Sequence, residues 1–349
     1  MFIRLTIASI LLLGPASIPA AAQTPRPGTL ETYRDWIIGC DNVSRCEAVA
    51  LLPENGEMPD VALTMGVSRD ASIDATPEFW VERDAQDAGS YAFHVDGRRI
   101  ATAPATNGAA IVRGPQASAL VVEMARGRTM EIRFGGKVVA RPSLAGSGAA
   151  LRYMDAAQGR AGTVTALVAT GPIAAHAMRR PPVAPVVRRA IAPSGAAPAA
   201  LTREELAIVG RITDCAQEMK QSDSKPSLHR VSRTETLVLV PCGSGAYNFS
   251  SMALIATGAA GHRNFRMARF DYPPGWSESP DQPLLVNAAW TPEHSRLESF
   301  AKGRGLGDCG GSEAYVWDGM RFRLVGARAM GECRGAWHWI PTWTAKVVE

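Results

Sequence analysis

The residues best suited to chemistry in this sequence surround Cys309. This cysteine stands in the segment GDCGG, residues 307–311. Glycines beside a nucleophile allow backbone N–H groups to point at a developing oxyanion. A thiolate also needs a neighbouring base, for which His262 and His294 are the close upstream candidates. The pattern therefore indicates a cysteine hydrolase as one of two possible functions.

A structural role for Cys309 competes with that chemistry. The sequence contains six cysteines, an even number, as is typical of a disulfide framework in an oxidising compartment. We favour pairing of sequence neighbours, because each pair then stays within one local unit. The pairs predicted in this way are Cys40–Cys46, Cys215–Cys242 and Cys309–Cys333. A bonded Cys309 leaves no thiol to attack a substrate, so this alternative has no catalytic residue.

The segment KGRGLGD, residues 302–308, is the candidate ligand-binding loop. Lys302 and Arg304 could hold a phosphate or carboxylate, helped by backbone N–H groups, and Asp308 closes the segment. The loop lacks the preceding strand, the following helix and the GK[ST] ending of a phosphate-binding loop. The alternative is a tight loop whose backbone conformation requires glycine.

Other residue types give weaker chemical signals. The six histidines are scattered and none lies four residues from another, so we predict no metal site and no cofactor. His338, between two tryptophans, is expected to be a packing or surface residue. The C-terminal third contains Trp276, Trp290, Trp317, Trp337, Trp339 and Trp343. These predict a packed core or, alternatively, an aromatic-lined groove for a glycan or peptide.

The N-terminus predicts export. Residues 1–22 have a charged start at Arg4, an apolar run, and small residues before a cleavage site near Ala22, as in a secretory signal peptide. No later stretch reaches the length of about 18 apolar residues that a membrane helix needs. A net charge of +4 is small for 349 residues and does not favour a nucleic-acid partner. We expect a periplasmic or secreted protein without a transmembrane segment in the mature chain.

The first domain, residues 23–180, is expected to be β-rich. Asp96-Gly97 and Gly135-Gly136 are typical of two-residue hairpin turns, which need positive φ at both positions. Apolar spacing predicts helices over Gln116–Arg126 and Ser147–Gln158. Strands are expected at Trp36–Ile38, Val61–Val67, Glu78–Arg83, Tyr91–Val95, Thr129–Phe134 and Lys137–Arg141.

Residues 181–200, rich in Pro, Ala and Arg, predict an extended linker, with docking on an anionic surface as the alternative. The second domain, residues 201–349, begins with a helix that Thr202 and Glu205 cap. The apolar stripe of this helix is Leu206, Val209, Ile212 and Cys215. Strands are expected at Thr236–Val240, Tyr247–Ile255, Asn264–Phe270, Leu284–Trp290, Arg296–Phe300 and Trp337–Val348.

Asp318-Gly319 predicts one more two-residue turn, with Trp317 opposite Met320 and Tyr315 opposite Phe322. Strands in succession with few helices favour antiparallel sheets. The expected fold class is α+β, mainly β: two antiparallel-sheet domains with a few short helices, held together by disulfides.

Two groups of residues resemble a known family. The first is Asp35, Trp36, Cys40, Asp41, Asn42 and Cys46, and the second is the set of segments KGRGLGDCG, WDG and ECRG. Both resemble the exported proteobacterial domain-of-unknown-function family 1176, over most of the mature chain. The first domain is also similar to the invasion-associated locus B family, through its DW start and a strand followed by a short helix at residues 138–158. The resemblance implies a periplasmic or secreted β-rich protein without established activity.

Taken together, the residues and the resemblance predict an exported, non-enzymatic binding or interaction protein. Its partner would be an envelope component or a small anionic ligand, bound at a loop that contains Lys302, Arg304 and Asp308. The alternative is the hydrolase that uses Cys309.

Overall fold

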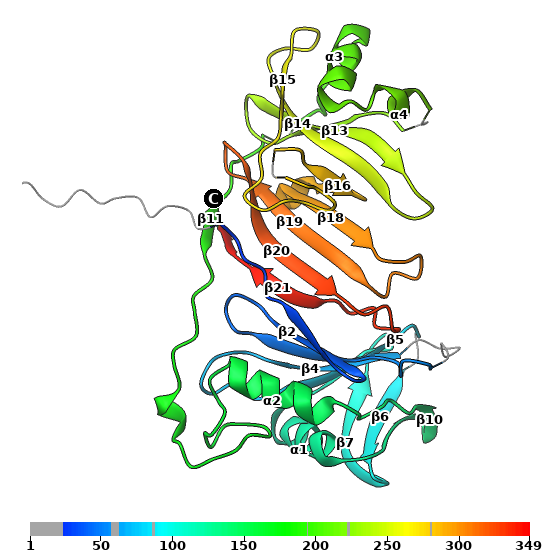
Figure 1. Ribbon diagram of the computed structural model, residues 1–349, viewed down its shortest axis with the longest axis vertical. Coiled ribbons are helices and arrows are strands. Elements are labelled where there is room, and N and C mark those ends of the chain that lie inside the picture. Colours follow the sequence, from blue (N-terminus) through cyan, green and yellow to red (C-terminus); the bar gives the residue numbers. More distant parts are fainter. Residues whose placement is uncertain (1–23, 57–62, 86–87, 194, 222–223, 280) are drawn as a thin grey trace, which may run out of the picture.

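The N-terminal half folds into two antiparallel sheets. Figure 1 shows the computed structural model, which describes residues 24–56, 63–85, 88–193, 195–221, 224–279 and 281–349. The larger sheet has the strand order β1 (Leu30–Tyr33), β2 (Trp36–Cys40), β3 (Cys46–Ala50), β4 (Leu63–Arg69), β5 (Glu78–Arg83) and β8 (Ala110–Val112). The smaller sheet has the order β10 (Lys137–Ala140), β9 (Met130–Phe134), β6 (Gly89–Val95) and β7 (Arg98–Ala105). The predicted signal peptide lies outside the described residues, as does the start of the strand predicted at Val61–Val67.

Two of the predicted hairpin turns are confirmed in detail. Asp96 and Gly97 have φ values of 46° and 78°, and they join Val95 directly to its partner Arg98. Gly135 and Gly136 have φ values of 56° and 84° in the turn between β9 and β10. Positive φ at both central positions gives the turn the twist of the strands that it connects.

Two helices close the core of the N-terminal half. α1 (Gly114–Arg126) packs on β5, β6 and β7, and α2 (Ser147–Ala157) packs on β1, β2 and β3. The apolar residues that predicted α1 are buried: Ala117, Leu120, Val121 and Met124. Both helix predictions are therefore confirmed.

The C-terminal half is a sandwich of two further antiparallel sheets. The first has the order β12 (Ser227–Arg230), β13 (Glu235–Ser244), β14 (Phe249–Thr257) and β15 (Asn264–Met267), with β16 (Leu284–Val286) also paired to β14. The second has the order β17 (Ala289–Thr291), β18 (Arg296–Lys302), β19 (Gly310–Trp317), β20 (Phe322–Met330) and β21 (Ile340–Thr344). Apolar side chains of both sheets form one buried cluster between them. The described residues also form 3-10 turns at Ala175–Ala177 and Pro292–His294.

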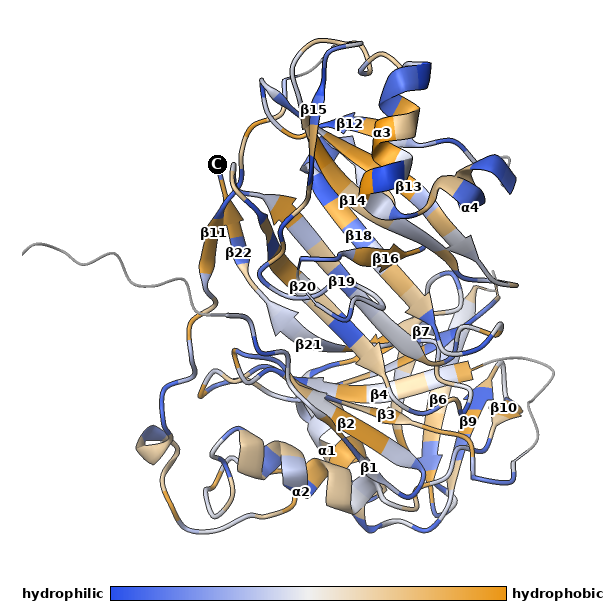
Figure 2. Ribbon diagram, turned by 45° about the horizontal axis from the view of Figure 1, so that its top comes forward, coloured by the Kyte–Doolittle hydropathy of each residue, from blue (hydrophilic) through white to orange (hydrophobic). Residues whose placement is uncertain are grey.

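α3 (Arg203–Thr213) and α4 (Ala216–Gln221) cover the outer face of the β12–β15 sheet. Figure 2 shows hydrophilic helix turns above hydrophobic segments of β13 and β14. The capping box of Thr202 and Glu205 is present as predicted. The apolar stripe is wrong at Ile212, which is 40% exposed, because Glu205 occupies the inner face and pairs there with Arg263 at 2.9 Å.

The turn at Asp318-Gly319 differs from its prediction. Trp317 pairs with Phe322 instead of Met320, so the loop has four residues. The Asp318 carboxylate accepts backbone N–H groups of Met320 and Arg321 at 2.8 and 2.9 Å, which holds this wider loop. The register moves by two residues, and because strand side chains alternate, the predicted apolar face is preserved.

Two other strand predictions need correction. The single strand expected at Leu284–Trp290 is two strands, separated at Asn287, whose φ is 44°. The segment predicted as a linker contains β11 (Val186–Arg188), which pairs in parallel with β22 (Lys346–Val348). Val187 is buried there against Val316 of the neighbouring sheet. We call β11 and β22 together the strap.

The two halves meet where the six-stranded sheet packs against β21 and its neighbours (Figure 1). Their contact has an apolar centre of Ile37, Val49, Leu51, Trp80, Cys309, Met330, Ala336, Trp339 and Ile340. We call this contact the seam. The expectation of an α+β, mainly β fold of antiparallel sheets with a few short helices is confirmed.

Candidate functional site

All six cysteines form disulfides, in the three pairs expected from their order: Cys40–Cys46, Cys215–Cys242 and Cys309–Cys333. Cys215–Cys242 ties the end of α3 to β13. Cys309 is 2% exposed. A cysteine nucleophile reacts as a thiolate, and in the bonded state Cys309 has no thiol.

In the loop predicted to bind an anion, the charges of Arg304 and Asp308 pair with each other. Asp308 is fully buried, and Arg304 donates to both of its carboxylate oxygens, at 2.8 and 2.5 Å. The backbone N–H of Gly335 donates a third hydrogen bond at 2.7 Å. Burial would raise the pKa of Asp308, but these hydrogen bonds outweigh it and hold the pKa below its usual value. The binding role of the loop stays a prediction, and its geometry gives Arg304 and Asp308 a structural use.

Lys302, the third predicted binding residue, has its backbone fixed by one side chain. The amide of Asn248 donates to the Lys302 carbonyl at 2.8 Å and accepts the Lys302 N–H at 3.2 Å. Two partly exposed apolar side chains lie at the loop, Leu306 within it and Trp337 beside it. Trp337 donates its indole N–H to the carbonyl of Leu306, and these residues are 37% and 54% exposed. The predicted neighbourhood of aromatic side chains therefore exists, although Trp317 and Trp339 are buried.

Motif residues of the C-terminal half bind the N-terminal half across the seam. The Arg334 guanidinium donates to the carbonyls of Leu52 and Arg34, both at 2.7 Å, and to the Asp35 carboxylate at 2.5 Å. Arg334 belongs to the ECRG segment, and Asp35 to the opening motif. Residues 299 positions apart in sequence thus form one partly buried contact.

Asn42 makes a second link across the seam. Its side-chain amide accepts the N–H of Thr344 at 2.7 Å and donates to the Thr344 carbonyl at 3.0 Å, much as a neighbouring strand would. Asp41 accepts the N–H groups of Val43 and Arg45 and so holds the turn that presents Asn42. The motif residues act as the joint between the two halves.

His338 forms a third link. Its Nε2 lies 2.8 Å from the Glu47 carboxylate and its Nδ1 lies 3.6 Å from the Glu82 carboxylate. Its ring lies against Trp80, with centroids 4.3 Å apart and planes tilted by 34°. Burial would lower the pKa of His338, but the hydrogen bond to Glu47 and the charges of both glutamates raise it above its ordinary value. The pair with Glu47 strengthens when the ring is protonated.

A groove of about 530 Å³ lies on one face of the β17–β21 sheet. The β2–β3 hairpin contributes Asp41 and Arg45 to one side, and the strap contributes Val347 to the other. Residues of the sheet that line the groove include Arg296, Glu298, Phe300, Ser312, Arg328 and Trp343. The mixture of aromatic rings and charged groups suits a polar ligand with an apolar part.

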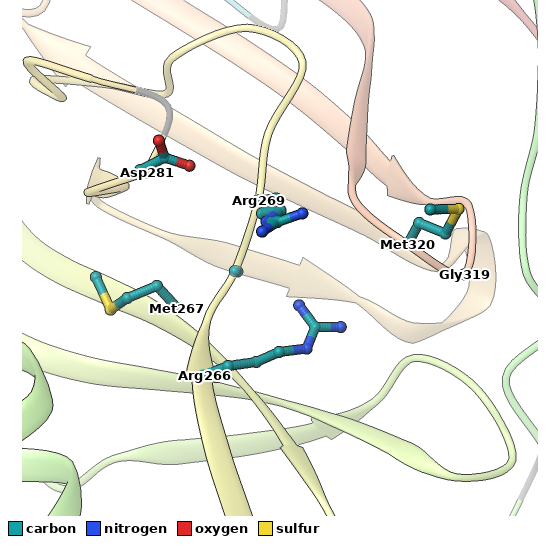
Figure 3. Close-up of a pocket in the computed structure, with 7 residues that line it drawn as sticks. Arg266, Met267, Arg269, Asp281, Gly319 and Met320 are labelled. Atoms are coloured by element: carbon teal, nitrogen blue, oxygen red, sulfur yellow. The ribbon is translucent and has the colours of Figure 1, made fainter.

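A second cleft, of about 520 Å³, lies between the end of β15 and the β19–β20 loop. In Figure 3, Arg266 and Arg269 point toward the loop of Gly319 and Met320, while Asp281 lies on the other side of the strand. Arg266 is already used, because it pairs with Glu235 at 3.2 Å and lies over the Trp317 ring.

Our interpretation of the sequence missed the groove. Its signal was the alternation Arg296, Glu298, Phe300, which places three large side chains on one face of β18. Within the part of the chain that the structure describes, no group of three or more His, Cys, Asp or Glu side chains could hold a metal ion. No helix among those residues is long and apolar enough to cross a membrane.

Comparisons with known proteins agree with the resemblance seen in the motifs. The family described as "Protein of unknown function (DUF1176)" matches residues 30–346. The uncharacterized protein YpfG of Escherichia coli (strain K12) is 26% identical over 356 residues, which cover 97% of each chain. No solved structure matches the chain. The looser similarity to the invasion-associated locus B family is not shown by these matches and stays an expectation. With nearly its whole length matched, the chain belongs to the DUF1176 family of proteins of unknown function.

Proposed function

We propose that this chain is an exported, non-enzymatic binding protein of the cell envelope, located in the periplasm or secreted after cleavage near Ala22. The single observation that supports this proposal most is the pairing of all six cysteines into disulfides. Disulfides persist in oxidising compartments and are rare in the cytosol. Its partner is an envelope component or a small anionic ligand rather than a nucleic acid.

The disulfide at Cys309 also argues against the hydrolase alternative. Gly310, which follows Cys309, has a structural use, because a Cβ there would lie 2.0 Å from the Ala301 carbonyl oxygen. Close packing of β19 on β18 therefore gives Gly310 a role that needs no oxyanion site, which supports the non-enzymatic proposal. The groove, with aromatic and charged side chains from both halves, is the surface that we assign to binding.

The test is mass spectrometry of the chain recovered from a fractionated bacterial culture, with thiols alkylated under denaturing, non-reducing conditions. We expect a mature chain that begins near Gln23, an extracytoplasmic location and no alkylated cysteine. Alkylation at both Cys309 and Cys333 would contradict the proposal and would favour the alternative, a cysteine hydrolase. A chain found in the cytoplasm with residues 1–22 intact would contradict the assigned location.

A further inference from the structure

The charged groups that line the groove on the β17–β21 sheet differ in how many of their hydrogen-bonding atoms have protein partners. The acidic residues of the groove all have partners. Glu298 pairs with Arg296 at 2.8 Å, and Glu313 accepts the backbone N–H of Gly275 at 3.1 Å. Asp41 accepts two backbone N–H groups of its own turn. The negative charges of the groove are therefore committed to the protein.

Arg328 differs from these groups. Its Nη1 donates to the carbonyl of Trp339 at 3.0 Å. Among the described residues no carboxylate lies within ion-pair distance of it, and its side chain is exposed to the groove. A guanidinium has five N–H donors and binds carboxylates with two parallel hydrogen bonds. Most of its donors are thus open to a ligand.

The neighbours of Arg328 add the other parts of a site. Ser312 is its cross-strand partner and brings a hydroxyl group, and Phe300 is the partner of Ser312 on the next strand. Arg45, from the β2–β3 hairpin, supplies a second cation whose own partner, Asp70, is distant at 3.6 Å and exposed. Cationic groups from both halves therefore border the same groove.

Two aromatic rings of the groove are held in place before any ligand arrives. Phe300 stacks on Trp339 with centroids 4.5 Å apart and planes 7° apart. Trp343 donates its indole N–H to the carbonyl of Leu324 at 3.2 Å. Rings fixed in this way lose little conformational entropy on binding.

Small residues at the base of the groove leave space for a ligand. Ala314 lies opposite Gly326 on the neighbouring strand. A Cβ at Gly326 would lie 3.8 Å from the Ala314 Cβ and 3.7 Å from Arg296, which is ordinary contact. The absence of a side chain there opens space without any need for special backbone geometry. A volume of about 530 Å³ is within the usual range of small-molecule sites.

We propose that this groove binds a small organic carboxylate with a ring or other apolar body, and that Arg328 holds the carboxylate group. The inference rests on the proposed function and specifies its ligand class. The apolar body lies against Phe300, above Ala314 and Gly326. Arg45 strengthens the attraction for the negative charge.

Isothermal titration calorimetry on the full, oxidised mature chain tests the ligand class with three probes. N-acetylphenylalanine carries a carboxylate and a ring, its amide lacks the charge, and inorganic phosphate lacks the ring. We expect the acid to bind at least tenfold more tightly than either of the others. Equal binding of the acid and the amide, or no binding of the acid at millimolar concentration, would overturn the inference.

Variants test the residues. Arg328→Gln should weaken binding of the acid at least tenfold, and Arg328→Lys should weaken it less. The matched control is Arg99→Gln, which makes the same charge change at an exposed position on β7 and should leave binding unchanged. Gly326→Leu should block the floor while it leaves Arg328 in place. Circular dichroism establishes that each variant is folded.

The outcomes separate the two proposals. Unchanged affinity in both Arg328→Gln and Gly326→Leu would overturn the assignment of the groove. Failure of all probes with an exported, fully bridged wild-type chain would overturn this inference and leave the proposed function intact. Free thiols at Cys309 and Cys333 would overturn the proposed function whatever the groove binds.

Discussion

The seam and the groove are adjacent, but the cationic side chains of the seam have several protein partners, whereas Arg328 in the groove has one. At the seam, Arg334 binds three oxygen atoms of the other half, and His338 lies between two carboxylates. In the groove, Arg328 has a single carbonyl partner. The difference distinguishes charges that join the two halves from a charge that is available to a ligand. Removing the first kind should cost stability, and removing the second should not.

The largest expected effect comes from the disulfide beside the seam. Cys309 and Cys333 are next to Asp308 and Arg334, so the bond between them supports the Asp308–Gly335 hydrogen bond and the seam contacts of Arg334. Replacing both cysteines by alanine should lower the free energy of unfolding by roughly 3 kcal/mol. Urea unfolding at pH 7 measures this loss of free energy. Replacing Cys40 and Cys46, whose separation is 6 residues instead of 24, should have a smaller effect. Equal effects of the two pairs would contradict the comparison.

The next effect concerns Arg334. Arg334→Ala leaves the Asp35 carboxylate and two carbonyl groups without their donor at a site where the arginine side chain is 14% exposed. We expect a loss of about 2–3 kcal/mol in the same urea measurement, because unpaired buried polar groups are costly. The control Arg99→Ala should change stability by less than about 0.5 kcal/mol. A loss no larger than that of the control would show that the seam does not depend on this arginine.

A smaller, pH-dependent effect is expected at His338. Its pKa is raised in the folded state, so its contribution is fully present below the ordinary value of 6.5 and is lost as pH rises through the folded pKa. The stability difference between the wild type and His338→Gln should therefore shrink between pH 6 and pH 8.5. With the side chain 23% exposed, we expect less than about 1 kcal/mol. A difference that grows with pH would mean that the ring is neutral at the seam.

The smallest effect should come from Arg328. Arg328→Gln removes one hydrogen bond of an exposed side chain, so the free energy of unfolding, measured by thermal denaturation, should fall by less than about 0.5 kcal/mol. This result would distinguish Arg328 from Arg334, an arginine six residues further along the chain that is expected to stabilise the fold. A loss as large as that of Arg334→Ala would place Arg328 among the structural charges.

Local features of the fold could be predicted because short stretches determine them. Asp96-Gly97 and Gly135-Gly136 need positive φ at both positions, and few other dipeptides supply it. The capping box of Thr202 and Glu205 is likewise complete within four residues. The turn at Asp318 failed because its carboxylate competes for backbone N–H groups, a choice that the dipeptide alone does not reveal.

The candidate site could be predicted less well, because it depends on contacts between distant segments. Lys302, Arg304 and Asp308 are charged and flanked by glycines, which favours an anion site. In three dimensions Asp308 needs Arg304, together with Gly335 from another loop. Arg328 can be identified as a ligand-binding candidate only when the partners of the neighbouring acidic residues are known. Those partners lie on other strands and turns. Sequence spacing within one strand contains no such information.

The position of the seam in the chain has a consequence for biosynthesis. Ile37 and Trp80, which emerge early from the ribosome, are buried against Met330 and Ile340, which emerge much later. An early-folded N-terminal half would present this apolar surface to solvent until the final strands arrive, and exposed apolar surface of this kind promotes aggregation. A newly made chain must therefore be shielded, or delayed in folding, until its last residues are available.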